Sequence, residues 1–383
     1  MVSAAAAYLK ARQAASAVAA GTSHFGGTRL DATLVPRLHN ALLDAENGVA
    51  LTQTLFAFIG DSTMAGTRGA GDLKSNSYPW KLLPLISPFM AIDENGWYGN
   101  QISTSTVSDL PGYDSRLTLG TGVGFGGDFS IGGYPLSLDA ATGAITFTNN
   151  KAYDKLDLVL SCGGTPSTIG VQFGSGSVTN VVLTPSNYTL STLSKTLGTE
   201  PVVITKVAGA PRVQGMTLRN STAPKVMLAN MAKAGSSSVE WAATTNNRSP
   251  LSVLLALKPV AAFINLGIND WSLNVPVPTY RANMQAIITA LLPTTDIILS
   301  IPFPSNIAAT GGNYANQSQY VQVIRDLAAQ YNLPLLDFGR LFVSWEYSNP
   351  LGRYIDNRHP TPQRGYGMTA KFVARSLRAL LAL

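Results

Sequence analysis

The segment FIGDSTMAG (residues 58–66) continues an apolar run and breaks it at Gly60-Asp61-Ser62. The apolar run includes residues 56–59, which are Phe-Ala-Phe-Ile. A continuous apolar run is typical of a strand covered on both faces. A strand that stops at Gly-Asp-Ser presents a small hydroxyl at its tip, where a ligand can reach it. A serine used in this way also requires a base, an orienting acid and oxyanion donors from elsewhere in the chain.

Apolar strands alternate with amphipathic helices on both sides of a long β-rich segment. Strands are predicted over residues 52–59, 225–230, 261–267, 296–302 and 333–338. Helices are predicted over residues 78–87, 249–257, 280–292, 316–331 and 369–383. This alternation predicts an α/β protein in which a parallel sheet lies between two helical layers. Ligands bind outside the carboxyl ends of such strands, so residues at the strand ends are the candidates for a functional site.

A segment rich in Gly, Thr, Ser and Val, residues 112–222, interrupts this pattern. Alternating runs such as AITFTN and LDLVLS are separated there by turn residues, which predicts an inserted antiparallel β-sandwich. Leucines recur every four positions near the N-terminus, which favours a helix. The chain is therefore predicted to divide into four parts. They are an N-terminal helical segment (residues 1–50), a first part of the core (51–105), a carbohydrate-binding-like insertion (106–223) and a second part of the core (224–383).

Composition and charge exclude several classes of protein. Hydrophobic residues make up 45% of the 383 and charged residues 13%, so the chain can bury a large core and is not disordered. The net charge of +6 is not gathered in a Lys/Arg run, which argues against a nucleic-acid partner and is compatible with a polyanionic polymer. Cys162 is the only cysteine, and the three histidines are not at metal-ligand spacing. We therefore expect no internal disulfide, no metal and no cofactor.

The N-terminal sequence gives no clear indication of the compartment. Lys10 and Arg12 interrupt its apolar run, so it does not read as a clean signal peptide. No segment is predicted to span a membrane, because Lys258-Pro259 interrupts the apolar stretch 250–268. An extracellular, cell-surface or phage-particle location is the expectation, and the oligomeric state stays open.

Four short motifs at predicted strand ends or loops carry residues with catalytic chemistry. They are Ser62 in GDSTMAG, Gly235 in NMAKAG, Asn269 in GIND, and Asp356 with His359 in DNRH. An imidazole titrates near working pH, so His359 is the residue suited to remove the proton of Ser62. Asp356, three residues earlier, can accept a hydrogen bond from the other ring nitrogen and fix its tautomer.

The four motifs resemble, in order, the four blocks of the SGNH (GDSL-type) hydrolases. The resemblance covers about residues 52–96 and 225–383 and implies a flavodoxin-like α/β/α core. It also implies a nucleophilic Ser62, a triad with His359 and Asp356, and an oxyanion hole formed by the N–H groups of Ser62 and Gly235 with the Asn269 amide. Thr63 stands where the GDSL name has leucine, a variation of little mechanistic weight. The long insertion resembles the β-sandwich of several polysaccharide esterases in this superfamily.

These observations favour a serine esterase that removes small acyl groups, foremost acetyl, from a polysaccharide. A lipase or thioesterase acting on longer acyl chains is one alternative, and it predicts an elongated apolar channel near Ser62. The other is a glycan-binding tail or adhesion protein with a vestigial hydrolase. Trp271 adjoins GIND and is a candidate substrate-binding residue, with core packing as the alternative. Asp61 and Asp270 are predicted to brace their own loops.

Overall fold

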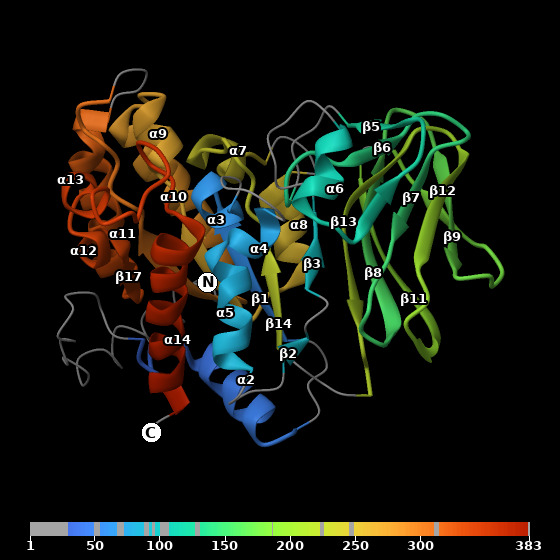
Figure 1. The fold of residues 1–383 in the computed structure, drawn as a ribbon, viewed down its shortest axis with the longest axis horizontal. Coiled ribbons are helices and arrows are strands. Elements are labelled where there is room, and N and C mark those ends of the chain that lie inside the picture. The colour runs from blue at the N-terminus through green and yellow to red at the C-terminus, as the bar shows by residue number, and fades with distance from the viewer. Residues whose placement is uncertain are drawn as a thin grey trace, which may run out of the picture.

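The protein consists of a helix-covered parallel sheet with an antiparallel β lobe beside it (Figure 1). The computed structural model describes residues 30–49, 54–66, 73–87, 92–93, 96–99, 107–126, 131–185, 187–222, 226–244, 249–309 and 314–381. Most of the predicted N-terminal helical segment, residues 1–29, lies outside the described residues.

The parallel sheet has six strands in the order β17-β16-β15-β1-β14-β2. Their bounds are β1 Thr54–Gly60, β2 Ile92–Asp93, β14 Val226–Asn230, β15 Ala261–Asn265, β16 Asp296–Ile301 and β17 Leu335–Asp337. Each neighbouring pair is parallel. Without the two-residue edge strand β2, the order is that of the doubly wound flavodoxin type, whose ligands bind where the winding reverses between β1 and β15. The predicted fold class is confirmed.

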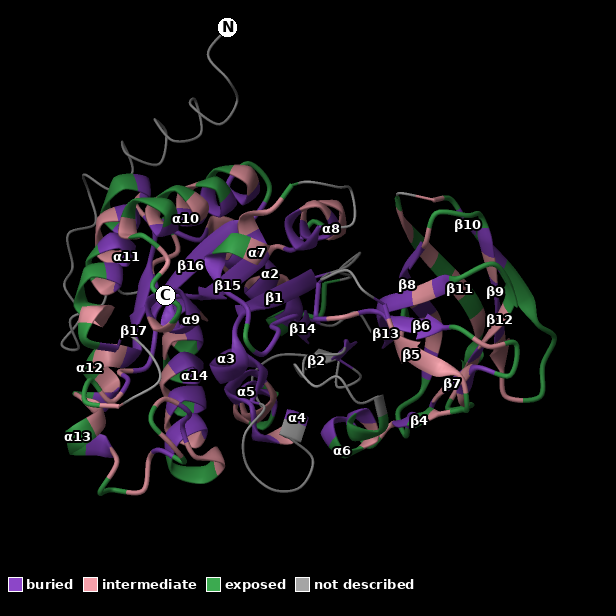
Figure 2. Cartoon of the chain, turned by 90° about the horizontal axis from the view of Figure 1, so that it is seen from above, coloured by how far each residue is buried: buried purple, intermediate pink, exposed green. Residues whose placement is uncertain are grey.

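Helices cover both faces of this sheet (Figures 1 and 2). One face carries α2 (Pro36–Glu46), α5 (Tyr78–Ile86) and α14 (Gly367–Leu381), and the other carries α8 (Pro250–Leu257), α10 (Val277–Leu291) and α11 (Gln317–Tyr331). The shorter helical segments are α3 (Ser62–Ala65), α4 (Leu73–Asn76), α7 (Ser238–Ala242), α9 (Ile268–Ser272), α12 (Phe338–Phe342), α13 (Trp345–Ser348), a 3-10 turn Tyr314–Asn316 and a π turn Pro362–Tyr366.

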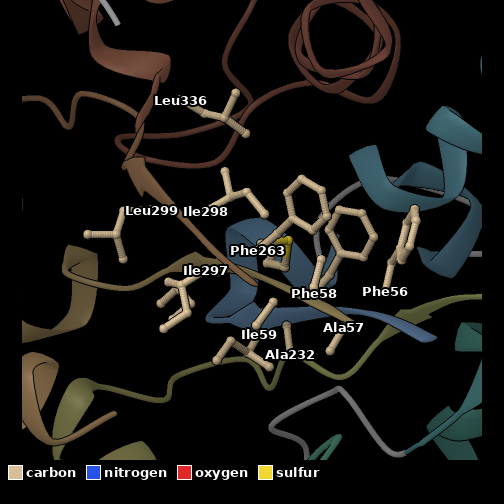
Figure 3. Close-up of a cluster of buried hydrophobic side chains, with 14 of the residues drawn as sticks. Phe56, Ala57, Phe58, Ile59, Ala232, Phe263, Ile297, Ile298, Leu299 and Leu336 are labelled. Atoms are coloured by element: carbon tan, nitrogen blue, oxygen red, sulfur yellow. The ribbon is translucent and has the colours of Figure 1, made fainter. Parts of the chain in front are cut away.

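The buried strand β1 explains why the apolar run of the opening segment has no polar face. Phe56 and Phe58 lie on one side of the strand, and Ala57 and Ile59 lie on the other (Figure 3). All four side chains are fully buried, because helices cover both faces. The ring of Phe58 stacks on Phe263 of β15, with centroids 4.5 Å apart. A strand packed in this way holds its last residue, Gly60, in a fixed position at the edge where ligands bind.

The insertion is built from two antiparallel sheets. One has the order β10-β9-β12-β7-β4, and the other has β11-β8-β13-β6-β5 with β3 paired to β13. The first contains β4 Leu117–Leu119, β7 Ala144–Phe147, β9 Ser167–Phe173, β10 Thr179–Leu183 and β12 Val202–Ala208. The second contains β3 Trp97–Tyr98, β5 Val123–Phe125, β6 Leu136–Leu138, β8 Tyr153–Cys162, β11 Tyr188–Gly198 and β13 Pro211–Arg219. A 3-10 turn, Val107–Asp109, and α6 (Leu110–Tyr113) precede β4.

The strands of the insertion begin earlier than the predicted boundary at residue 106. Strand β3, at Trp97, already pairs with β13 of the antiparallel lobe. The Trp97 ring lies so close to Gly215 of β13 that a Cβ on that residue would be 2.0 Å from it. Trp97 and Val159 of β8 also belong to the core cluster of the parallel lobe, so the two lobes share apolar contacts.

Candidate active site

Ser62 lies at the start of a short helix that follows β1 directly. Asp61 caps this helix, because its Oδ1 accepts hydrogen bonds from the Thr63 backbone N–H at 2.8 Å and the Thr63 hydroxyl at 2.7 Å. Gly60 is required just before the turn, since a Cβ there would lie 2.5 Å from the carbonyl oxygen of Asn265 on β15. The predicted bracing role of Asp61 is therefore confirmed.

The structure brings His359 and Asp356 to Ser62 although 297 positions separate Ser62 from His359. The Ser62 hydroxyl oxygen lies 2.8 Å from His359 Nε2, and His359 Nδ1 lies 2.8 Å from Asp356 Oδ2. Asp356 Oδ1 also accepts the backbone N–H groups of Arg358, at 2.9 Å, and of His359, at 2.8 Å. A single loop thus holds both the imidazole and the carboxylate that orients it.

Electrostatics keep the Asp356 carboxylate ionised. Its partial burial opposes ionisation, but the hydrogen bond and charge of the His359 ring, with the two backbone N–H groups, hold the pKa of Asp356 well below its usual value. The ionised Asp356 carboxylate lies next to Nδ1 of His359, so it favours the imidazole tautomer that is protonated on Nδ1. The lone pair of Nε2 then faces the Ser62 hydroxyl.

Gly235 and Asn269 lie on segments joined to the end of β1. The Ser236 hydroxyl donates to the Gly60 carbonyl at 3.0 Å, and the Asn269 side-chain amide donates to the Ser236 carbonyl at 2.7 Å. Gly235 has a φ of +78°, a conformation that glycine adopts without strain. Sequence reasoning assigned no role to Ser236, which connects the loop after β14 to Gly60 at the end of β1 and to Asn269 after β15. Its only signal was its place beside Gly235.

Trp271 occupies a different environment from the predicted one. It is only 1% exposed, and its ring packs edge-on against Tyr320 of α11 with centroids 6.1 Å apart. Helix α9 turns by about 100° per residue, so a side chain two positions after Asn269 faces nearly the opposite way. This burial argues against the predicted substrate contact and corrects it to core packing.

The buried carboxylate of Asp270 braces the neighbouring helix α7. Its carboxylate accepts the Ser238 backbone N–H at 3.0 Å and the Ser238 hydroxyl at 2.6 Å. Burial raises the pKa of Asp270 to about 6, even though these hydrogen bonds act in the opposite direction. Asp270 was predicted to brace its own GIND loop, but its carboxylate instead fixes the start of α7, which follows the second motif.

The insertion reaches the second motif directly. The Lys233 ammonium lies 4.8 Å from the centroid of the Tyr134 ring, and Gly132 N–H donates to the Met231 carbonyl at 2.9 Å. On the side of the DNRH motif, the Arg358 guanidinium lies 5.6 Å from the centroid of Tyr314. Residues of the insertion therefore contact the loop that carries Gly235.

The described part of the chain contains neither a cluster of metal ligands nor a membrane-spanning helix. No group of three or more His, Cys, Asp or Glu side chains there is arranged to hold a metal ion. Among the same residues, no helix combines the length and apolar character needed to cross a bilayer.

Comparison with known proteins agrees with this fold. The sequence model of the GDSL-like Lipase/Acylhydrolase family matches residues 205–366, which include Gly235, Asn269, Asp356 and His359. The structure is similar to that of a peptidoglycan O-acetylesterase, with a TM-score of 0.67 and 15% identity over 90% of this chain and 96% of that one. A search of curated protein sequences returns no match.

Two further solved structures are less similar. A lipase/acylhydrolase from Enterococcus faecalis has 21% identity and a TM-score of 0.34 over 40% of this chain and 77% of its own. An acetyl xylan esterase has 17% identity and a TM-score of 0.31 over 40% of this chain and 79% of its own. The fold and the order of the four motifs agree with the resemblance to SGNH hydrolases. The match of residues 205–366 to the GDSL-like lipase/acylhydrolase model confirms the resemblance noted in the sequence.

Proposed function

We propose that the protein is a serine esterase that hydrolyses small acyl esters, foremost O-acetyl esters, on a polysaccharide. The observation that carries this proposal is the chain of short contacts from the Ser62 hydroxyl through His359 to Asp356, each of 2.8 Å. Such an arrangement of nucleophile, base and orienting acid is the one that acyl transfer requires.

In the first half of the proposed reaction, the Ser62 oxygen attacks the ester carbonyl and its proton passes to His359 Nε2. The carbonyl oxygen becomes an oxyanion, for which the N–H groups of Ser62 and Gly235 and the Asn269 amide are the proposed donors. Asn269 gives one hydrogen to Ser236, and its amide nitrogen carries a second. The tetrahedral adduct then collapses, and the sugar oxygen leaves with the proton from His359.

In the second half, water attacks the acyl-serine while His359 accepts its proton. Collapse of the new adduct releases the carboxylic acid and returns the proton to the Ser62 oxygen. Throughout both steps Asp356 stays ionised and stabilises the imidazolium, in keeping with its lowered pKa.

A polysaccharide substrate is supported by the insertion that contacts the second motif through Tyr134 and Lys233. The fold similarity to a peptidoglycan O-acetylesterase extends over 90% of the chain and so includes this lobe. An antiparallel lobe placed beside the strand ends is suited to hold a polymer while one of its esters reacts.

Replacing Ser62 by alanine tests the proposal. We expect acetate release from acetylated polysaccharides, and hydrolysis of p-nitrophenyl acetate, to fall by more than about 10⁴-fold with the fold intact. Ser376→Ala is the matched control, because Ser376 lies in α14 and its hydroxyl donates to the Phe372 carbonyl of the same helix. Retained turnover by the folded Ser62→Ala protein would refute the mechanism. Faster hydrolysis of octanoate than of acetate esters would favour the lipase alternative.

A further inference from the structure

A second pocket, distinct from the triad, lies between α5 and the edge of the insertion. Its volume is about 540 Å³, within the range of small-molecule sites, and its lining includes neither Ser62 nor His359. Trp80 and Lys81 of α5 form one wall, and Arg116, Asn149 and Lys151 of the insertion form the other. The pocket exists only because the two lobes pack together.

The lining of this pocket is cationic. Among the described residues that form it are three cations, Lys81, Arg116 and Lys151, and no carboxylate. Lys81 is partly buried, and the loss of water around its ammonium group lowers its pKa. A partly desolvated cation attracts an anion more strongly than a fully hydrated one does.

Arg116 is held in place before any ligand arrives. Its Nε and Nη2 donate to the two oxygens of Asp114, at 2.9 Å and 2.8 Å, and its guanidinium lies 4.6 Å from the centroid of Phe147. Lys74 binds the same Asp114 carboxylate at 3.0 Å. Two cations therefore share one acid beside the pocket, and a fixed arginine loses little freedom on binding.

Trp80 provides an aromatic surface among these charges. Its side chain is partly exposed, and the Lys74 ammonium lies 3.9 Å from the ring centroid. The opposite wall is a short ordered loop, in which the Asn149 amide donates to the Lys151 carbonyl at 2.8 Å. An aromatic ring, amides and cations in one concave site match a ligand with apolar ring faces, hydroxyl groups and carboxylates.

We propose that this pocket binds an acidic polysaccharide, with Lys81 and Lys151 pairing with its carboxylates, Arg116 adding to the positive wall and Trp80 packing on a sugar ring. The inference rests on the proposed function in one respect: the polymer held here would be the one whose ester Ser62 cleaves. The pocket wall is connected to the nucleophile helix, because Tyr113 of α6 donates to the Ala65 carbonyl of α3 at 3.0 Å. Helices α4 and α6 lie side by side at this junction (Figure 2).

Binding to the inactive Ser62→Ala chain separates this inference from catalysis. Calorimetry with polygalacturonate oligomers should show binding that weakens between about 0.05 M and about 0.5 M salt, with neutral xylan oligomers binding less tightly. Adding Lys81→Gln and Lys151→Gln should weaken polygalacturonate binding about tenfold. The control, Lys155→Gln with Lys206→Gln, removes equal charge from two partly exposed sites of the insertion outside the pocket and should leave binding unchanged.

Equal binding by the pocket variant and the control would overturn the inference, as would equal affinity for xylan or for a DNA oligonucleotide of matched charge. In the active chain, Lys81→Gln with Lys151→Gln should leave hydrolysis of p-nitrophenyl acetate unchanged and raise KM for an acetylated polyuronate. If the wild-type protein binds polygalacturonate but hydrolyses no ester, the proposed function is refuted and the proposed binding site is still supported.

Discussion

Replacing Asp356 by asparagine changes the chemistry of the proposed triad while keeping the shape of the side chain. In the structure Asp356 Oδ1 accepts two backbone N–H groups, from Arg358 and His359, and Oδ2 faces His359 Nδ1 at 2.8 Å. An asparagine can keep its carbonyl oxygen on the two N–H groups. Its amide nitrogen then takes the place of Oδ2 and presents a hydrogen to Nδ1.

This exchange reverses the tautomer of the imidazole. A donor at Nδ1 requires a lone pair there, so the ring proton moves to Nε2 and faces the Ser62 hydroxyl 2.8 Å away. His359 then cannot accept the serine proton. We expect kcat for p-nitrophenyl acetate to fall about 10⁴-fold, which corresponds to about 5 kcal/mol of transition-state stabilisation.

The matched control is Asp326→Asn, which removes a carboxylate that pairs with Arg281 on the helix surface at 3.2 Å. Its activity should equal that of wild type. Circular dichroism and thermal unfolding establish that both variants are folded. Combining Asp356→Asn with Ser62→Ala should reduce activity no further than Ser62→Ala alone, because groups that act as a unit are not additive. A folded Asp356→Asn protein with activity within about tenfold of wild type would refute the tautomer argument.

Two further predictions concern neighbouring residues. Asn269→Ala should lower kcat by about 10²–10³-fold with little change in KM, because an oxyanion donor acts in the transition state. Steady-state kinetics measure this effect. An unchanged kcat would show that Asn269 is not part of the proposed oxyanion hole. Burial raises the folded-state pKa of Asp270 from 3.8 to about 6, so the native state holds this proton more tightly than the unfolded chain does. The protonated Asp270 therefore stabilises the fold at low pH, and this contribution is lost as the pH rises past 3.8 and through about 6. Between about pH 4 and pH 7, the unfolding free energy of wild type should fall by about 2–3 kcal/mol relative to that of Asp270→Asn. Urea unfolding at several pH values measures the difference, and parallel stability curves for the two proteins would contradict the raised pKa.

Local sequence patterns predicted most of the secondary structure of the parallel lobe. The predicted strand 225–230 is Val226–Asn230, and the predicted helix 316–331 is Gln317–Tyr331. The ends of elements were less predictable. Helix α10 starts at Val277 rather than residue 280, because a proline fits within the first turn of a helix, where its missing N–H is not needed. Strand β15 ends at Asn265, and Gly267, with a φ of +140°, turns the chain into α9.

The candidate site was also foreseen in part. The identities of Ser62, Asp356 and His359 follow from short motifs, whose side chains suit acyl transfer wherever they occur together. The direction of Trp271 did not follow, because an aromatic residue near a strand end can face either the core or a ligand. Burial of the α9 face against α11 decided it.

By itself, the sequence determined the alternation of strands and helices and the set of side chains available for chemistry. Both are local properties, written in the spacing of apolar residues and in short motifs. The tertiary structure alone decided that His359 meets Ser62, that Ser236 links the second and third motifs, and that α5 and the insertion enclose a cationic pocket. These contacts join segments far apart in the chain, and their geometry depends on how whole layers pack, which no local pattern records.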